Sequence, residues 1–126
     1  LLADCQGIAL HSLGGGYRQE AGSFIGPMAE AALERLQIDL AFLGTSGVTL
    51  DGSFSSQNSI EAELKRKVMA RATRSLVLFD ASQLGRRGFT VFATIDEVTG
   101  VVTDASSGQL ELIADRGVEI IHSDKE

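Results

Sequence analysis

Residues 38–44 read Ile-Asp-Leu-Ala-Phe-Leu-Gly, an almost continuous apolar run that ends in a glycine. Residues 76–79 read Leu-Val-Leu-Phe and are followed by Asp80. Short runs of this composition are typical of strands that are buried on both faces of a parallel sheet. The two runs therefore predict an α/β fold.

Outward from these two runs, shorter apolar stretches predict further strands over residues 8–13, 89–93, 101–103 and 118–121. Helical patterns lie between the strands. An alternation of strands and helices requires crossover connections, which are right-handed and give parallel pairing. We expect an α/β fold class with a mostly parallel open sheet and flanking helices.

The first helical pattern begins at Pro27, because proline fits the first helical position, where its missing N–H would have no partner. Its expected buried face, at four-residue spacing, consists of Met28, Ala32 and Leu36. Another pattern spans residues 107–116 and ends at Gly117. Its expected buried residues are Leu110, Ile113 and Ala114.

The strongest helical pattern follows Asn58 or Ser59, either of which can cap it. Its expected buried stripe consists of Ile60, Leu64, Val68 and Ala72. Its expected ion pairs, four residues apart, are Glu61–Lys65 and Glu63–Lys67. No repeat or linker divides residues 1–126, so we expect a single domain. Residues 45–57 show no pattern, and a loop of this length in a compact domain is often functional.

Composition excludes several classes of protein. The net charge of −6 over 126 residues argues against a nucleic-acid surface on this segment, because phosphate binding needs a basic patch. The single cysteine, Cys5, excludes an internal disulfide and a multi-cysteine metal site, so we expect a reducing, cytoplasmic compartment. No uncharged apolar run reaches the ~18 residues of a transmembrane helix. The sequence begins at Leu1, from which we expect a processed product or a piece of something longer.

Ligand sites in open parallel sheets lie beyond the carboxyl ends of the strands. Four segments past predicted strands are rich in small, hydroxyl-bearing or acidic residues: 14–18, 44–47, 80–83 and 103–106. Exposed N–H groups and hydroxyls of this kind bind sugar hydroxyls and phosphates. A single glycine after a strand is equally consistent with a simple turn. The four loops together suggest a polyol or phosphate pocket.

Other motifs give weaker signals. Residues 44–47 lack the lysine of a nucleotide P-loop. His11 and His122 lie in apolar runs without a second ligand at metal spacing, which indicates core or edge histidines and no metal site. The basic cluster 65–67 indicates a solvated helix face. Lys65 is the exception, because it lies in the first turns of the helix that follows the 45–57 loop.

The order of the motifs carries a resemblance to a known family. Six segments carry it, in this order along the chain: 13–18 (Leu-Gly-Gly-Gly-Tyr-Arg), 22–26, 38–47, 63–66 (Glu-Leu-Lys-Arg), 78–86 (Leu-Phe-Asp-Ala-Ser-Gln-Leu-Gly-Arg) and 102–104. This ordered set resembles the sensor domain of the DeoR family of bacterial transcriptional repressors, across nearly the whole chain. The resemblance implies a fold related to ribose-5-phosphate isomerase and an effector that is a phosphorylated sugar or polyol.

The resemblance also implies partners and missing parts. Family members bind operator DNA through an N-terminal helix-turn-helix domain, and they usually form homo-oligomers. We expect that this sequence lacks that domain and the first part of the sensor domain. No cofactor, metal or membrane partner is implied.

The resemblance assigns ligand-binding roles to twelve residues. They are Gly15, Gly16, Arg18, Asp39, Gly44, Ser46, Gly47, Lys65, Asp80, Ser82, Gln83 and Arg86. Gln83 departs from the family motif, which has lysine there, and glutamine can donate a hydrogen bond but supplies no charge to a phosphate. Arg86 is close enough in sequence to compensate.

Two alternatives to a sensor domain remain at this point. A sugar-phosphate isomerase shares the fold, but it needs a positioned base and donors for an enediolate. The isomerase motifs Asp-Gly-Ala-Asp-Glu and Lys-Gly-Gly-Gly are missing, so we expect no enzyme. A pure oligomerisation module is the other alternative, if the shortened pocket binds nothing.

Overall fold

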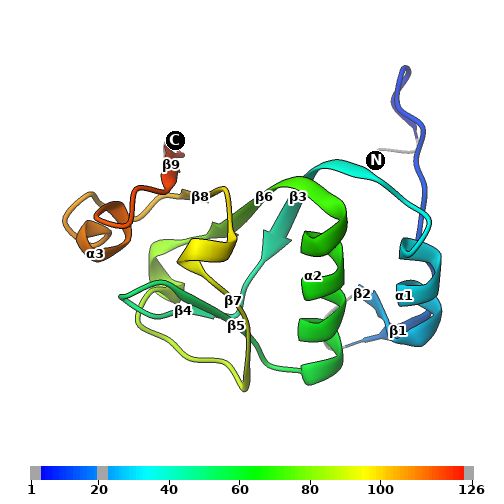
Figure 1. The fold of residues 1–126 in the computed structure, drawn as a ribbon, viewed down its shortest axis with the longest axis horizontal. Helices are drawn as coiled ribbons and strands as arrows, with labels where there is room; N and C mark the ends of the chain where they lie inside the picture. Colours follow the sequence, from blue (N-terminus) through cyan, green and yellow to red (C-terminus); the bar gives the residue numbers. More distant parts are fainter. Residues whose placement is uncertain (1–3, 20–22, 124–126) are drawn as a thin grey trace.

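The computed structural model describes residues 4–19 and 23–123. Its main element is a four-stranded parallel sheet with the strand order β3–β6–β8–β9 (Figure 1). The strands are β3 (Ile38–Gly44), β6 (Ala72–Phe79), β8 (Gly100–Thr103) and β9 (Glu119–His122). The expectation of an α/β fold on a mostly parallel sheet is confirmed.

One face of this sheet carries the hydrophobic core. Leu43, Val77 and Val101 are register partners on neighbouring strands, and all three are buried. Successive side chains of a strand point to opposite faces, and on the outer face Leu40 and Phe42 are 38% and 62% exposed. Leu78 of β6 lies on the same outer face and is 40% exposed, so the prediction that the runs 38–43 and 76–79 are buried on both faces is wrong.

Helix α2 (Ser59–Arg71) packs against β3, β5, β6 and β7. Asn58 caps it, since its side-chain oxygen accepts from the N–H groups of Ile60 and Glu61. The predicted stripe needs correction, because Ala62 is buried and Ile60 is 49% exposed. The face that meets the sheet runs through Ala62 and Lys65, so it is rotated from the one predicted.

Helix α1 (Pro27–Leu33) begins at Pro27 as predicted, but it buries a different face. Ala29 and Leu33 are buried, whereas Met28 is 73% exposed. The reason is its position beside α2, where Glu30 pairs with Lys67 at 2.5 Å. The buried face is thus shifted by one residue from the predicted stripe, and Lys67 pairs with Glu30 where a pair with Glu63 was predicted.

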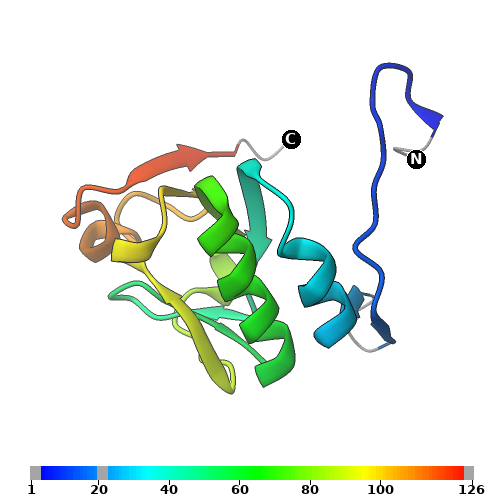
Figure 2. The same cartoon turned by 45° about the vertical axis from the view of Figure 1, so that its right-hand side comes forward.

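The predicted strand over residues 8–13 is wrong. The segment is extended but irregular, and it lies apart from the four-stranded sheet (Figure 2). Among the described residues no strand pairs with it, so its backbone has no ladder to join. The chain instead forms a short antiparallel pair, β1 (Gly16–Arg18) and β2 (Ser23–Ile25), beside α1.

Residues 45–57, predicted to be a loop, contain two strands. β4 (Gly47–Val48) and β5 (Ser53–Ser56) form an antiparallel sheet with β7 (Thr90–Thr94), in the order β4–β5–β7. The sequence gives little signal because β4 is two residues long and β5 is mostly serine. The two short strands are stabilised by the core, in which the Phe54 and Phe92 rings lie 6.3 Å apart.

The remaining elements are short. The helix predicted over residues 107–116 is reduced to α3 (Glu111–Ala114), after turns that cover residues 107–110. Leu110 and Ile113 are buried as expected, but Ala114 is exposed. Gly117 ends the segment at φ +76°, as predicted for a left-handed position. Two 3₁₀ turns complete the structure, η2 (Ala81–Gln83) and η3 (Ile95–Glu97).

Candidate functional site

Three loops meet where the parallel strands end. The register pairs Gly44 with Leu78 and Phe79 with Thr103, so β3, β6 and β8 finish at one edge of the sheet. Hydrogen bonds join the loops beyond this edge. Gln83 Nε2 donates to the Thr45 carbonyl at 2.6 Å, and the Ala81 N–H donates to Asp104 Oδ1 at 2.8 Å.

The segment Asp80–Gln83 forms a turn that is held by hydrogen bonds between its own residues. Asp80 Oδ1 accepts from the N–H of Ser82 at 2.9 Å and from its hydroxyl. Gln83 Oε1 accepts from the Asp80 N–H at 3.0 Å, which completes a capping box around η2. The side-chain oxygen of Gln83 therefore accepts a hydrogen bond at the start of η2, and its side-chain nitrogen donates one to the loop after β3. It acts as a clamp between the two loops and brings no charge.

A cavity of about 410 Å³ lies at the ends of β6, β8 and β9. Its lining is Leu78, Phe79, Asp80, Gln83, Val102, Thr103, Asp104 and Ser123. The polar part consists of carboxylates, hydroxyls and an amide, and among the residues that the structure describes no lysine or arginine lines it. These groups are suited to sugar or polyol hydroxyls, which can donate to carboxylates. Volumes of 300–1,000 Å³ are usual for small-molecule sites.

Lys65 ties α2 to the end of β3. Its ammonium lies 2.8 Å from the Gly44 carbonyl, 3.1 Å from Ser56 Oγ and 3.6 Å from Glu61 Oε1. It also lies 4.9 Å from the centre of the Phe92 ring, and its side chain is only 16% exposed. Two of its N–H donors are therefore hydrogen-bonded within the protein, and the charge is paired with Glu61.

Burial lowers the pKa of Lys65, because desolvation of the ammonium outweighs the attraction of Glu61. The position is not the solvated face indicated for its neighbours. Lys65 holds the site together, and two of its donors are already engaged within the protein.

Other predicted site residues join this edge through their backbones. A Cβ atom on Gly47 would lie 2.5 Å from the Arg86 carbonyl oxygen, so only glycine allows the loop after η2 to approach β4. The Ser46 N–H donates to the Ser55 carbonyl at 2.8 Å. The side chain of Arg86 is exposed. The structure therefore brings eight predicted residues together: Gly44, Ser46, Gly47, Lys65, Asp80, Ser82, Gln83 and Arg86.

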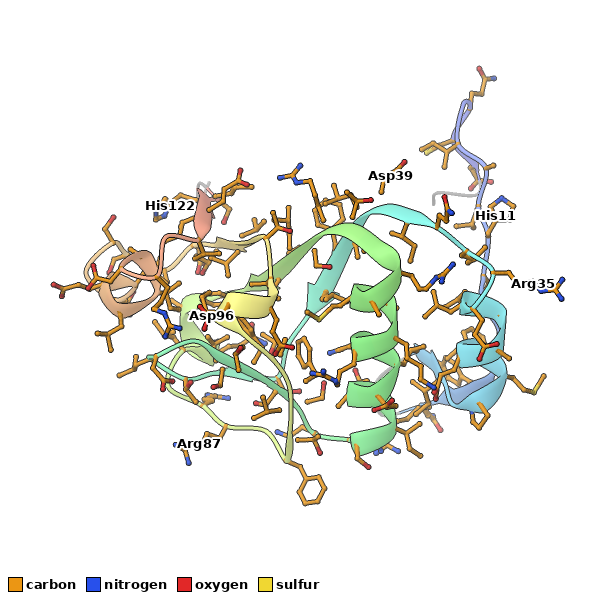
Figure 3. The ribbon with its side chains drawn as sticks, in the orientation of Figure 1. His11, Arg35, Asp39, Arg87, Asp96 and His122 are labelled. Carbon is orange, nitrogen blue, oxygen red and sulfur yellow. The ribbon has the colours of Figure 1, made fainter. Side chains whose placement is uncertain are left out.

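The other four predicted residues lie elsewhere. Asp39 is at the start of β3, five residues before Gly44, and is therefore about 16 Å from the site at the usual rise of a strand. Figure 3 shows it exposed at the far end of the strand. Gly15, Gly16 and Arg18 precede or belong to β1, which lies outside the parallel sheet. Gly15 has a packing role, since a Cβ there would lie 2.8 Å from the Ile25 carbonyl oxygen.

A second polar cavity was missed by the sequence analysis. It has a volume of about 380 Å³ and lies against the small antiparallel sheet. Its lining is Thr49, Asp51, Ser53, Ser55, Arg87, Gly88 and Val91. The signal that could have revealed it is the period-two pattern Ser53-Phe54-Ser55, which places two hydroxyls on one face of a strand.

The described residues also limit other site types. Within 4–19 and 23–123, no three His, Cys, Asp or Glu side chains gather as a metal site requires. His11 and His122 are both exposed, and His122 lies on the edge strand β9. No helix in this part of the chain has the length and apolar character needed to cross a membrane.

Comparison with known proteins gives a consistent picture. Residues 1–105 match the family model described as the DeoR C terminal sensor domain. The HTH-type transcriptional regulator GlpR of Haloferax volcanii is 33% identical over 110 residues, which are 86% of this chain and 43% of that protein. The L-fucose operon activator of Escherichia coli (strain K12) is 33% identical over 97 residues, covering 77% of this chain and 40% of its own length.

A third relative covers more of the chain. The putative aga operon transcriptional repressor of Escherichia coli O157:H7 is 30% identical over 122 residues, or 95% of this chain and 45% of that protein. The chain therefore spans less than half the length of each of these relatives. All three are named as regulators of transcription, with an activator and a repressor among them, and none is named as an enzyme.

Proposed function

The chain belongs to the DeoR family as a C-terminal sensor domain, and from this premise we propose that it binds a phosphorylated sugar or polyol. Binding of this effector would change how the whole protein engages operator DNA. The contact with DNA belongs to a helix-turn-helix part of the whole protein, which the acidic sensor domain does not supply.

One observation carries the proposal. The loops after β3, β6 and β8 meet beside a cavity whose polar lining is rich in hydrogen-bond acceptors, including Asp80 and Asp104. Such acceptors bind the hydroxyls of a sugar or polyol with charge-assisted hydrogen bonds. Arg86 does not line the cavity, but it is exposed a few residues after Gln83, and we propose that it supplies positive charge to a phosphate at this end of the sheet. Lys65 acts as a positioning residue.

Regulation follows from differential binding. An effector shifts an equilibrium between two states only by as much as its affinity differs between them. Gln83 lines the cavity and is hydrogen-bonded to the loop after β3, and Lys65 joins the Gly44 carbonyl in that loop to α2. We propose that occupancy of the cavity is transmitted to α2 through these contacts. We further propose that the protein works in the cytoplasm as a homo-oligomer, in keeping with its role as a transcription regulator.

The test is calorimetric titration with a panel of sugar and polyol phosphates, each paired with its unphosphorylated form. We expect one phosphorylated compound to bind. The variant Asp104→Asn should weaken this binding about tenfold, since one charged acceptor is worth roughly 1.5–3 kcal/mol. Asparagine keeps an oxygen for the Ala81 N–H, so the loop should stay in place.

Asp39→Asn provides the matched control, because it removes the same charge at the opposite end of β3. We expect it to leave the affinity unchanged. Equal weakening by both variants would mean that only the net charge of the domain matters. Binding of no phosphorylated compound by the wild-type protein would contradict the proposed effector class.

A further inference from the structure

The cavity of about 380 Å³ beside the antiparallel sheet shares no lining residue with the cavity at the end of the parallel strands. It lies between β5, β7 and the loop that carries Arg87, and its lining includes an arginine and several hydroxyls. It therefore combines a cation with hydroxyl donors, a combination that the described residues do not form at the other cavity.

Two close backbone contacts fix the loop around Arg87. On one side, the Arg86 carbonyl packs against Gly47, where a Cβ would approach to 2.5 Å. On the other side, Gly88 lies against β5, and a Cβ there would be 2.8 Å from the Ser56 carbonyl oxygen. The Gly88 N–H also donates to Ser55 Oγ at 2.6 Å. The backbone of Arg87 is therefore held at the cavity from both sides.

The polar groups of the cavity differ in whether they have hydrogen-bond or ion-pair partners within the described residues. In the part of the chain that the structure describes, no carboxylate pairs with the Arg87 guanidinium, and the Ser53 hydroxyl has no hydrogen-bond partner. Thr49, in contrast, donates its hydroxyl to Asp51 at 2.5 Å and accepts from the Ser53 N–H at 2.8 Å. The cavity thus offers one unpaired cation and one unused hydroxyl.

We propose that this cavity is a second ligand site, which binds the phosphate group of a small polyhydroxy compound between Arg87 and Ser53. The planar guanidinium matches two phosphate oxygens at once, and the serine hydroxyl donates to a third. Asp51 faces the same space and accepts from a hydroxyl of the compound. This carboxylate disfavours a bare phosphate ion and favours a phosphate that carries hydroxyl groups.

The experiment compares three probes with the full 126-residue chain: sorbitol 6-phosphate, sorbitol and inorganic phosphate. Amide chemical shifts in ¹⁵N-labelled protein would follow each titration. We expect saturable shifts at Ser53 and Gly88 with sorbitol 6-phosphate, weaker shifts with inorganic phosphate and none with sorbitol. Tighter binding of inorganic phosphate than of sorbitol 6-phosphate would overturn the role given to Asp51, and with it the polyhydroxy ligand.

The matched variants are Arg87→Ala and Arg35→Ala. Both arginines are exposed, and no described residue pairs with either. Figure 3 places Arg87 below the antiparallel sheet and Arg35 on the far side of the molecule beside α1. Arg87→Ala should weaken the binding of sorbitol 6-phosphate about tenfold or more, because the charged donors are lost. Arg35→Ala should leave it unchanged.

Two further outcomes separate this site from the one at the ends of the parallel strands. Asp104→Asn should not alter the shifts at Ser53 and Gly88 if the sites are independent. Shifts confined to Gln83 and Asp104, with full affinity retained in Arg87→Ala, would overturn the second site and leave the proposed function intact. The absence of any saturable shift with sorbitol 6-phosphate would also overturn the second site.

Discussion

Lys65 illustrates, at the scale of one residue, how a predicted ligand contact becomes a structural one. Its ammonium lies among the Gly44 carbonyl, the Ser56 hydroxyl and the Glu61 carboxylate. Two of its donors are hydrogen-bonded, and its charge is paired with the Glu61 carboxylate. The sequence could place Lys65 near the ends of the strands, but it could not reveal that the protein itself satisfies the charge.

We predict that the stability contribution of Lys65 depends on pH. Burial lowers its pKa below the ordinary value of 10.5, so the unfolded chain binds the proton more tightly than the folded protein does. Stability therefore rises with pH through the folded pKa and levels off above 10.5. Urea unfolding of wild type and Lys65→Met should show a difference in unfolding free energy that moves in favour of wild type as the pH rises.

Because wild type and Lys65→Met share every other titrating group, the difference between their unfolding free energies isolates the contribution of Lys65. Lys67 serves as the control position, because its pKa is raised by its hydrogen bond to Glu30. The wild type should therefore lose stability relative to Lys67→Met as the pH rises through the pKa of Lys67. Identical pH profiles for the two variants would contradict the assigned burial of Lys65.

At the scale of elements, the contact between β4 and the loop after η2 depends on a glycine. A side chain at Gly47 would meet the backbone of Arg86 and Arg87, which cannot move as a flexible side chain can. The loop is also held by the bond from the Gly85 N–H to the Val48 carbonyl at 2.6 Å. Both cavities border this loop, through Gln83 on one side and Arg87 on the other.

We predict that Gly47→Ala destabilises the protein by about 2–4 kcal/mol, in the range of severe packing conflicts. Thermal unfolding followed by circular dichroism would measure the loss. Gly108→Ala is the control, because nothing lies within 4 Å of its added Cβ and its φ is not in the left-handed region. A Gly47→Ala variant as stable as Gly108→Ala would show that the loop does not pack closely on β4.

The elements differ in how well the sequence predicts them. β3 and β6 contain the apolar runs 38–43 and 76–79, and α2 has a capping asparagine, so the existence of these elements follows from local chemistry. The start of β6 does not, because the strand begins at Ala72, which was predicted to belong to the buried stripe of the helix. β5 is mostly serine, and it forms a strand only because β4 and β7 lie beside it. The cavity around Arg87 could not be predicted for the same reason, because it forms only where β5, β7 and the loop with Arg87 pack together. Asp39 was assigned to the site by family resemblance alone, and the structure places it at the start of β3, away from the carboxyl ends of the strands.

The whole molecule is asymmetric about its parallel sheet. The inner face packs under α2, while the outer face presents Leu40, Phe42, Leu78 and Ile121, which are 38–62% exposed. Parallel sheets are ordinarily covered on both faces, and contiguous apolar patches on a surface mark contacts with other protein surfaces. β3 is also an edge strand, paired only with β6 among the described strands, so its second edge is open to another chain.

We predict that the 126-residue chain self-associates through this outer face. Sedimentation velocity should show a mass that increases with protein concentration, because burying Phe42 and its neighbours removes apolar surface from water. Phe42→Lys should shift the distribution toward the monomer. Phe89→Lys is the matched control: Phe89 is 80% exposed, but it lies in the loop before β7 and outside this face. A stronger effect of Phe89→Lys would place the contact between copies at that loop, and an unchanged mass at all concentrations would contradict self-association.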